Sequence, residues 1–269
     1  MFYPVHSSAK IFKAYLKMGS HPSKVRIQNM VGNQFFKKGI LIKNNEGVMY
    51  KLPANDWITR IMLMEGGYES RSLQLAADIM QDGGVFVDIG ANFGLYSCWV
   101  AKQPNVEAII SVDPNYQIIP SLLANIKLNN AAGKVFVYNT AITADAGFVT
   151  LEQPAADNLG TTKTNSGSKG LLNIGSCTLE TLLQTNNIKS VSLIKIDIEG
   201  NEFSVFEKFD FTKFDIANIL LEFNHLSPVS LEELLTFFQT KGYSAFDVKG
   251  NVLDNSKEII ENNIWLKKK

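Results

Sequence analysis

The segment with the clearest chemical content is VFVDIGANFGLYS, residues 85–97. It has the pattern of an apolar strand that ends in an acid, followed by a glycine-rich turn and a helix. At the carboxyl end of a parallel strand a ligand can lie in the crevice of the sheet, and Gly90 and Gly94 allow the backbone to approach it closely. Asp88 would bind a cationic group of that ligand. The alternative is a tight strand-to-helix connection that holds no ligand.

The spacing of the glycines indicates which ligand this turn can hold. Gly90, Asn92 and Gly94 do not reproduce the G-x-G-x-x-G pattern that cradles a pyrophosphate, which disfavours a dinucleotide. Asp113 ends the next predicted strand, where a carboxylate can accept two hydrogen bonds from the vicinal hydroxyls of a ribose. Asp113 alone could equally be a solvated strand end. Together with Asp88 it indicates a nucleoside that carries an amino-acid-like tail.

A second acidic segment is LIKIDIEGNEF, residues 193–203, in which a buried strand carrying Lys195 is followed by Asp197, Glu199 and Glu202. Crowding acids at one strand end costs repulsion unless hydrogen bonds or a cation offset it, and such crowding is typical of functional sites. The alternative is a helix start, because carboxylates favour the first turn of a helix. We expect Asp197 to belong to a site and leave both interpretations open for the two glutamates.

The third candidate segment is LLEFNH, residues 220–225, in which Glu222 and His225 follow another predicted strand. A histidine near the active edge of a sheet could take a proton from an acceptor hydroxyl, although single histidines are more often structural or exposed. The candidate general bases are therefore Asp197, Glu222 and His225, in no fixed order.

Taken in order, the motifs VDIGANFGLYS, VDPNYQIIPSLLANIKLNN, CTLETLL and KIDIEGNE resemble the FkbM-type family of S-adenosylmethionine-dependent methyltransferases. The similarity covers roughly Gly66 to Leu266. It implies a doubly wound α/β fold of class I methyltransferase type, Rossmann-like, with a mostly parallel seven-stranded sheet whose last strand is antiparallel. It also implies O-methylation of a sugar, glycan or secondary metabolite, with S-adenosylmethionine as cofactor and S-adenosylhomocysteine as product.

The resemblance also assigns roles to residues at matching positions. The methionine part of the cofactor would be held by Asp88, Gly90, Asn92 and Gly94, and the ribose by Asp113, which is commonly Glu in the family. Further cofactor-binding candidates are Ala91, Tyr96, Pro114, Asn115 and Ala141. Asp197 and Glu199 would lie beside the transferable methyl, and the acceptor would contact Asn158, Gly160, Glu199 and Asn224. Asn115, Asn125 and Asn129 match recurrent asparagines that could instead order the turn and helix, and no metal is implied.

The elements that position these residues begin near Val85, where apolar strands alternate with helical segments, a pattern typical of a parallel sheet covered on both faces. The predicted strands are Val85–Ile89, Ala108–Val112, Lys134–Ala141, Val191–Ile196, Ile216–Phe223, Ser244–Val248 and Asn263–Leu266. A helix after the second strand is indicated by the apolar stripe Ile118, Ile119, Leu122, Leu123 and Ile126.

The first part of the chain has a different pattern, and we expect a cap over residues 1–65 and a methyltransferase domain over 66–269 with an inserted loop at 152–176. A basic amphipathic helix is predicted for Ser8–Met18 and a hairpin for Gly39–Leu52. The helix could pack as part of the cap or lie on a membrane surface. The cap could also mediate homo-oligomerisation.

Composition narrows the class of partner. Lys plus Arg and Asp plus Glu are both 26, so no net field attracts a polyanion, and a small-molecule or carbohydrate acceptor is favoured over nucleic acid. The two cysteines lack metal-like spacing, no leader pattern opens the chain, and the apolar runs are too short to cross a bilayer, so we expect a cytoplasmic protein. The competing interpretations are an RNA or protein methyltransferase, a nucleotide-dependent oxidoreductase and a non-catalytic binding module.

Overall fold

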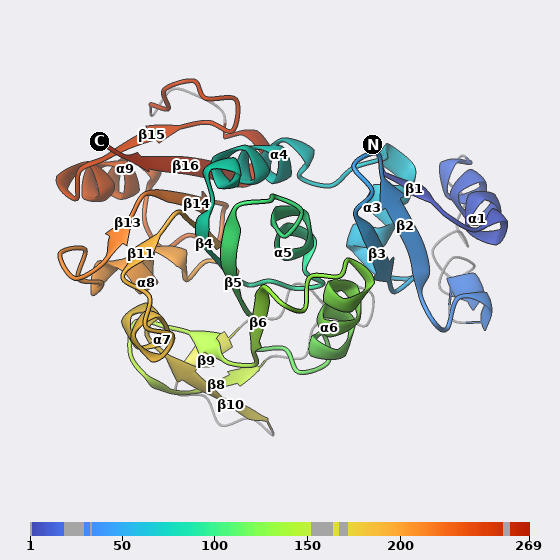
Figure 1. Ribbon diagram of the computed structural model, residues 1–269, viewed down its shortest axis with the longest axis horizontal. Coiled ribbons are helices and arrows are strands. Elements are labelled where there is room, and N and C mark those ends of the chain that lie inside the picture. The colour runs from blue at the N-terminus through green and yellow to red at the C-terminus, as the bar shows by residue number, and fades with distance from the viewer. Residues whose placement is uncertain (1, 19–29, 33, 152–163, 167–171, 255–258) are drawn as a thin grey trace.

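A twisted sheet of seven strands forms the centre of the computed structural model, which describes residues 2–18, 30–32, 34–151, 164–166, 172–254 and 259–269 (Figure 1). In spatial order the strands are β15 (Tyr243–Phe246), β16 (Asn263–Lys268), β14 (Asn218–Glu222), β12 (Leu193–Ile196), β4 (Gly84–Ile89), β5 (Val106–Val112) and β6 (Val135–Tyr138). Strand β16 runs antiparallel to both of its neighbours, and the remaining pairs are parallel. The expected fold class is confirmed.

Helices cover both faces of this sheet because each central strand sends alternate side chains to opposite sides. Phe86 of β4 joins one apolar core and its neighbour Val87 joins the other. The first core is covered by α4 (Ser70–Ile79), α5 (Leu95–Val100) and α6 (Ile119–Leu128). The second is covered by α7 (Leu179–Thr185), α8 (Glu202–Glu207) and α9 (Leu231–Thr240). Short 3-10 turns occur at Met80–Asp82 and Ile260–Asn262.

The N-terminal region adds a small antiparallel sheet beside α6 (Figure 1). Its strands are β1 (Phe2–Pro4), β2 (Ile40–Asn44) and β3 (Met49–Leu52), so the hairpin predicted from the sequence is confirmed. Helix α1 (Ser7–Lys17) packs on the cap through Ala9, Phe12 and Leu16, whereas Ile11 is 73% exposed. Helix α3 (Trp57–Glu65) follows. None of the described helices combines the length and apolarity that a membrane span needs.

Two asparagines, one in α6 and one at its C-terminal end, attach the cap to the domain that contains the central sheet. Asn125 accepts a hydrogen bond from the backbone N–H of Lys51 at 2.7 Å and donates to the carbonyl of Phe93 at 2.9 Å. Asn129 accepts from the backbone N–H of Met49 at 2.9 Å and donates to its carbonyl at 2.6 Å. These side chains therefore form hydrogen bonds with the backbone groups at the outer edge of β3, which no other strand pairs with in the described residues. This is a structural role, as in the alternative to ligand binding.

Three expectations about local structure need correction. The strand predicted for Lys134–Ala141 ends at Tyr138, because the Asn139 side chain turns back to donate to the carbonyl of Asp113 at 2.9 Å. Residues 141–142 instead begin a second sheet with strand order β7-β10-β8-β9. Its strands are β7 (Ala141–Ile142), β10 (Asn173–Cys177), β8 (Gly147–Leu151) and β9 (Thr164–Ser166).

The prediction of a loop over residues 152–176 also needs correction, because β9 and most of β10 lie within that range. In the α6 stripe, Leu123 is 49% exposed and does not belong to the core. The described chain also contains a short parallel pair, β11 (Ser190–Val191) with β13 (Asp215–Ile216).

Candidate functional site

A cavity of about 780 Å³ opens at the carboxyl ends of β4, β5, β12 and β14. Because these parallel strands all end at the same edge of the sheet, the acids that terminate them meet around one space. Asp88, Asp113, Asp197 and Glu222 all line it, and His225 lies at its wall. The cap completes the enclosure through Trp57, Ile58 and Ile61 of α3.

The glycine-rich turn after β4 adopts left-handed backbone angles, with φ of 80° at Gly90, 50° at Asn92 and 81° at Gly94. The first glycine is needed because a Cβ atom there would lie 1.8 Å from the carbonyl oxygen of Asp197. A Cβ atom at Gly94 would lie 2.5 Å from Leu122. The lack of a side chain at Gly90 and Gly94 is thus required by contacts with other segments of the same chain. The close approach of a ligand stays a prediction.

Asp88 is 1% exposed and faces helix α5. Its Oδ2 accepts hydrogen bonds from the backbone N–H of Ser97 at 3.1 Å and from the Ser97 hydroxyl. Burial raises the pKa of Asp88 to about 6, while the Ser97 hydrogen bonds and the charge of Lys195 act in the opposite direction. Asp88 therefore holds the start of α5 against the sheet, in addition to lining the cavity.

Asp113 uses each carboxylate oxygen once, and the side chain is 6% exposed. Oδ2 accepts from the backbone N–H of Asn92 at 2.8 Å, and Oδ1 accepts from that of Asn115 at 2.8 Å. Burial raises its pKa to about 6, opposed by these two hydrogen bonds. A carboxylate oxygen has more than one acceptor site, so each oxygen retains capacity for a further donor from the cavity.

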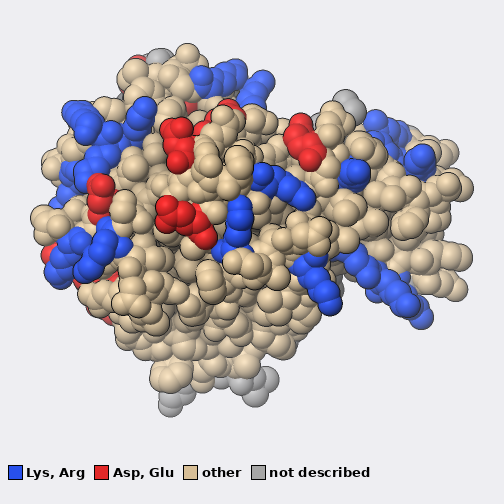
Figure 2. Space-filling view, in the orientation of Figure 1, with Lys and Arg blue, Asp and Glu red and all other residues tan. Residues whose placement is uncertain are grey.

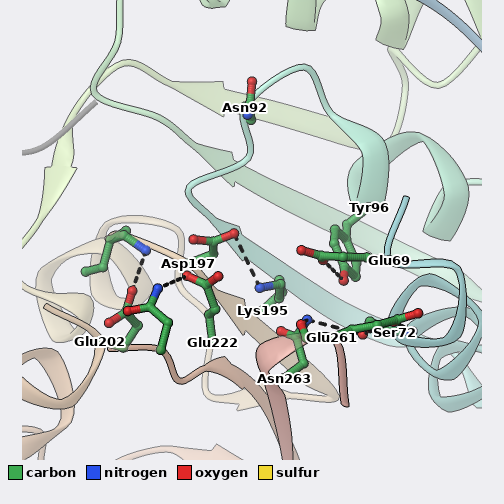
Figure 3. A network of polar contacts seen from close by, with 12 residues as sticks. Glu69, Ser72, Asn92, Tyr96, Lys195, Asp197, Glu202, Glu222, Glu261 and Asn263 are labelled. Atoms are coloured by element: carbon green, nitrogen blue, oxygen red, sulfur yellow. Dashed lines mark hydrogen bonds and ion pairs between the residues drawn. The ribbon is translucent and has the colours of Figure 1, made fainter. Parts of the chain in front are cut away.

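Lys195, Asp197 and Glu222 form the central group of charges (Figure 3). The Lys195 ammonium is 2% exposed and lies 3.7 Å from Oδ2 of Asp197. Burial lowers the pKa of Lys195, but the surrounding acids, Asp197 foremost, raise it more. Burial, followed by the charge of Asp197 and a hydrogen bond with it, raises the pKa of Glu222 to about 9. Glu222 therefore keeps its proton at neutral pH, next to a buried cation.

A second acidic group, which no sequence motif indicates, joins this network from the start of α4. Glu69, in a left-handed conformation with φ of 44°, accepts a hydrogen bond from the Tyr96 hydroxyl at 2.6 Å. The ammonium of Lys195 lies 5.4 Å from the centre of the Tyr96 ring. Burial raises the pKa of Glu69, whereas Lys195 lowers it. The cation is therefore shared between acids from both sides of the cavity.

The two glutamates left open by the sequence differ in role. Oε1 of Glu202 accepts from the backbone N–H of Ile198 at 2.7 Å and from that of Gly200 at 3.1 Å, so the helix-start interpretation holds for it. Glu199 lines the cavity in a left-handed conformation with φ of 61°. One oxygen each of Asp197, Glu202 and Glu222 lie within 4.8 Å of one another, a spacing that a divalent cation could bridge.

Most of the predicted site residues meet at the cavity. Its lining includes Gly90, Ala91, Asn92, Tyr96, Pro114 and Ala141 in addition to the acids and His225. Three are placed elsewhere: Gly94 packs on Leu122, and Asn115 and Asn224 bond within their own turns. Asn224 contributes indirectly, because its side chain donates to Oε2 of Glu222 at 3.1 Å. Asn158 and Gly160 lie outside the described residues.

The cap contributes residues that no local motif indicates. Trp57, at the start of α3, is 44% exposed and its ring lies 5.8 Å from that of Tyr68, at an interplanar angle of 88°. Both aromatic side chains line the cavity. The sequence shows only that Trp57 follows Asp56, which caps α3, and this position carries no information on a distant pocket.

Comparison with known proteins agrees with this geometry. A family model described as methyltransferase FkbM domain matches residues 88–245. Hexuronic acid methyltransferase AglP of Haloferax volcanii is 26% identical over 149 residues, which are 55% of this chain and 58% of that protein. The match thus spans little more than half the length of the curated relative.

Similar solved structures include the methyltransferase FkbM of Methylobacillus flagellatus, with 14% identity, a TM-score of 0.46, and 69% of this chain and 44% of that chain covered. TrmK of M. capricolum, solved with S-adenosyl-homocysteine, has 12% identity and a TM-score of 0.43, with 73% and 66% covered. The fold assignment follows from the strand order and the family match.

Proposed function

The chain belongs to the FkbM methyltransferase family, and from this premise we propose that it transfers the methyl group of S-adenosylmethionine to a hydroxyl of a sugar, glycan or secondary metabolite. The observation that carries the proposal is the convergence of Asp88, Asp113 and Asp197 on one cavity. Acids at different edges of the sheet could not have held a single ligand.

The cavity suits an adenosyl sulfonium in three respects. Asp113 has acceptor capacity on both oxygens for a ribose diol. The buried Oδ1 of Asn92 has no hydrogen-bond partner among the described residues, so the glycine-rich turn offers an unused acceptor. The acids at the cavity complement a positively charged ligand. We assign Gly90, Ala91 and Asn92 to the methionine part and Pro114 and Ala141 to the adenosine part.

When bound, the cofactor supplies an electrophilic methyl group. The protein must then align the acceptor oxygen and exclude water, an effect worth about 7 to 11 kcal/mol in well-oriented systems. Asp197 is the preferred general base, because its side chain is 30% exposed beside the Lys195 ammonium, whereas the raised pKa of Glu222 keeps that carboxyl protonated. The hydroxyl proton would pass to Asp197 while the acceptor oxygen bonds to the methyl carbon and the bond between that carbon and the sulfonium sulfur breaks, which would leave adenosylhomocysteine. His225 is the alternative base at the cavity wall.

The rim of the cavity favours a carbohydrate acceptor. Trp57 and Tyr68 offer an apolar aromatic surface with polar atoms at its edge, an arrangement suited to a ring that is apolar on one face and hydroxylated at its margin. The name of the relative AglP, a hexuronic acid methyltransferase, supports the same class.

A methyl-label transfer screen tests the proposal, with sugars, sugar acids, natural products and RNA as acceptors and adenosylhomocysteine release as the readout. We expect turnover with a hydroxylated sugar or secondary metabolite and none with RNA. A parallel thermal-shift panel compares adenosylhomocysteine with nicotinamide dinucleotides, since a bound ligand stabilises the fold. Stabilisation by the dinucleotides alone would overturn the methyl-transfer assignment.

A further inference from the structure

Positive charge is concentrated in the N-terminal region, although the whole chain is balanced. Residues 1–65 contain ten Lys and Arg but three Asp and Glu, whereas the complete sequence has 26 of each. Figure 2 shows that Lys and Arg dominate the charged side chains on the cap side of the visible face. Burial and the like charge of Lys17 both lower the pKa of Lys13. A local positive field therefore exists that net charge conceals.

A groove between the cap and α6 gathers part of this charge. It has a volume of about 580 Å³ and is lined by His6, Lys38, Lys51 and Lys127 together with small and apolar residues. No carboxylate lines the groove, and within the described chain none of its lysines forms an ion pair. A cationic groove without a neutralising acid is complementary to a phosphate group.

Large apolar side chains project into solvent from the same part of the cap. Ile11 is 73% exposed, Phe35 is 72% exposed, and Val5, next to His6 of the groove, is 40% exposed. The rings of Phe12 and Phe36 lie 5.4 Å apart, so α1 and the segment around residue 35 are adjacent. Apolar side chains set among lysines are typical of surfaces that lie at a lipid interface. Nucleic acid would use the charges but not the aliphatic side chains of Ile11 and Val5.

We propose that this face, defined by the groove lysines Lys38, Lys51 and Lys127 and by exposed Ile11 and Phe35, docks the enzyme peripherally on an anionic membrane surface. The lysines would bind lipid phosphates, and the two apolar side chains would enter the interfacial layer. The inference is independent of the chemistry assigned to the main cavity. It would place the enzyme where acceptors attached to lipids are found.

The test is co-sedimentation of the full chain with phosphatidylcholine vesicles that contain or lack phosphatidylglycerol, at low and at high salt. We expect binding only to the anionic vesicles, weakened by salt because exposed charges are screened. The triple variant Lys38→Gln, Lys51→Gln, Lys127→Gln should bind at least about tenfold more weakly. The double variant Ile11→Ser, Phe35→Ser should also lose binding, and its exposed positions leave the fold intact.

A matched triple variant distinguishes the loss of these particular lysines from the loss of three positive charges elsewhere on the protein. Lys189, Lys249 and Lys267 belong to the opposite end of the molecule, near β11, β15 and β16 (Figure 1). Changing all three to Gln should leave vesicle binding unchanged. The affinity for adenosylhomocysteine, measured by calorimetry, should stay unchanged in every variant. A failure of the membrane proposal can therefore be distinguished from a failure of the proposed methyltransferase activity.

Three results would overturn the proposal. One is equal binding, or none, to neutral and anionic vesicles. Another is tight binding to single-stranded RNA that the lysine variant abolishes while vesicles are ignored. The third is a dimer in analytical ultracentrifugation that Ile11→Ser, Phe35→Ser dissociates, since that face would then bind a second copy of the chain.

Discussion

The ammonium of Lys195 lies 3.7 Å from Oδ2 of Asp197, buried on strand β12 with carboxylates of three other segments around it. The register of β12 with β4 places Lys195 directly opposite Asp88, so the same cation neighbours both the strand that precedes the glycine-rich turn and the candidate base Asp197. Its charge makes the acidic cavity compatible with a stable fold, because buried acids repel one another without compensation.

Replacing this cation should destabilise the protein strongly. Lys195→Met keeps the apolar stem but leaves several acids without a partner, and we expect a loss of about 3 to 5 kcal/mol in the free energy of unfolding. Chemical denaturation measures it. The matched control is Lys208→Met, whose ion pair with Asp145 is exposed, with an expected loss below about 1 kcal/mol. Equal losses in both variants would show that Lys195 is not the compensating charge.

Removing the candidate base should affect turnover far more than cofactor binding. With an active acceptor in hand, Asp197→Asn should lower kcat by about a hundredfold to ten-thousandfold, because a general base contributes that much. Adenosylhomocysteine affinity, measured by calorimetry, should change little. The control Glu207→Gln alters an exposed acid of the neighbouring helix α8. Retained turnover in Asp197→Asn would transfer the role to Glu222 or His225.

The raised pKa of Glu222 predicts a specific pH dependence. Folded Glu222 keeps its proton up to about pH 9, whereas an unfolded glutamate releases it near pH 4.3. Between these values the unfolded state binds fewer protons, so wild-type stability falls as the pH rises.

Glu222→Gln is always neutral and should remove this contribution. Thermal unfolding at pH 6, 7.5 and 9 should therefore show a steeper decline for the wild type than for Glu222→Gln, with Glu207→Gln resembling the wild type. Asp88 and Asp113, whose pKa values burial also raises to about 6, are common to all three proteins and cancel in the comparison. Parallel curves for wild type and Glu222→Gln would contradict the assigned proton.

The ribose assignment of Asp113 predicts a loss of cofactor affinity. Asp113→Ala should raise the dissociation constant of adenosylhomocysteine tenfold or more, about 1.4 kcal/mol. Since Asp113 also accepts from two backbone N–H groups of the site turns, Asp113→Asn serves as a second variant that keeps the shape. Asp145→Ala, at an exposed position, is the control. An unchanged calorimetric titration for both Asp113 variants would reject this placement.

The attachment of the cap should depend on Asn129. Asn129→Ala removes hydrogen bonds to both backbone groups of Met49 and should destabilise the contact by about 1 to 3 kcal/mol, the cost of leaving buried polar groups unpaired. Hydrogen exchange should become faster in β3 and stay slow in β4. Equal protection of β3 in both proteins would show that other contacts hold the cap.

The parts of this structure that the sequence predicted are those with local signals. Apolar runs that end in acids located β4, β5, β12 and β14, and parallel strands necessarily bring Asp88, Asp113 and Asp197 to one edge. The helix-start alternative for Glu202 also depends on a local rule, and the position of Glu202 in the first turn of α8 agrees with it.

The parts that were missed depend on contacts between distant segments. Trp57 reaches the cavity because the cap folds over it, and Tyr68 reaches it from the segment between α3 and α4; nothing in the neighbouring residues specifies either approach. The sequence shows Lys195 as a lysine in an apolar strand. Apart from the nearby Asp197, however, the acids that surround its ammonium come from distant segments, such as Glu69, over a hundred residues away in sequence. Strand β9 was missed because its pairing with β8 is not evident in a polar, glycine-rich stretch.

The fastening of β3 by Asn125 and Asn129 has a consequence for engineering. The aromatic wall at Trp57 follows β3 directly in the chain, so its position over the cavity depends on a docking contact made outside the cavity. If the wall contacts the acceptor as proposed, a change of acceptor preference would require the transfer of residues 39–70 as one unit, together with the two asparagines that hold β3. Single replacements of rim side chains would change individual contacts but not the position of the backbone segment that carries them.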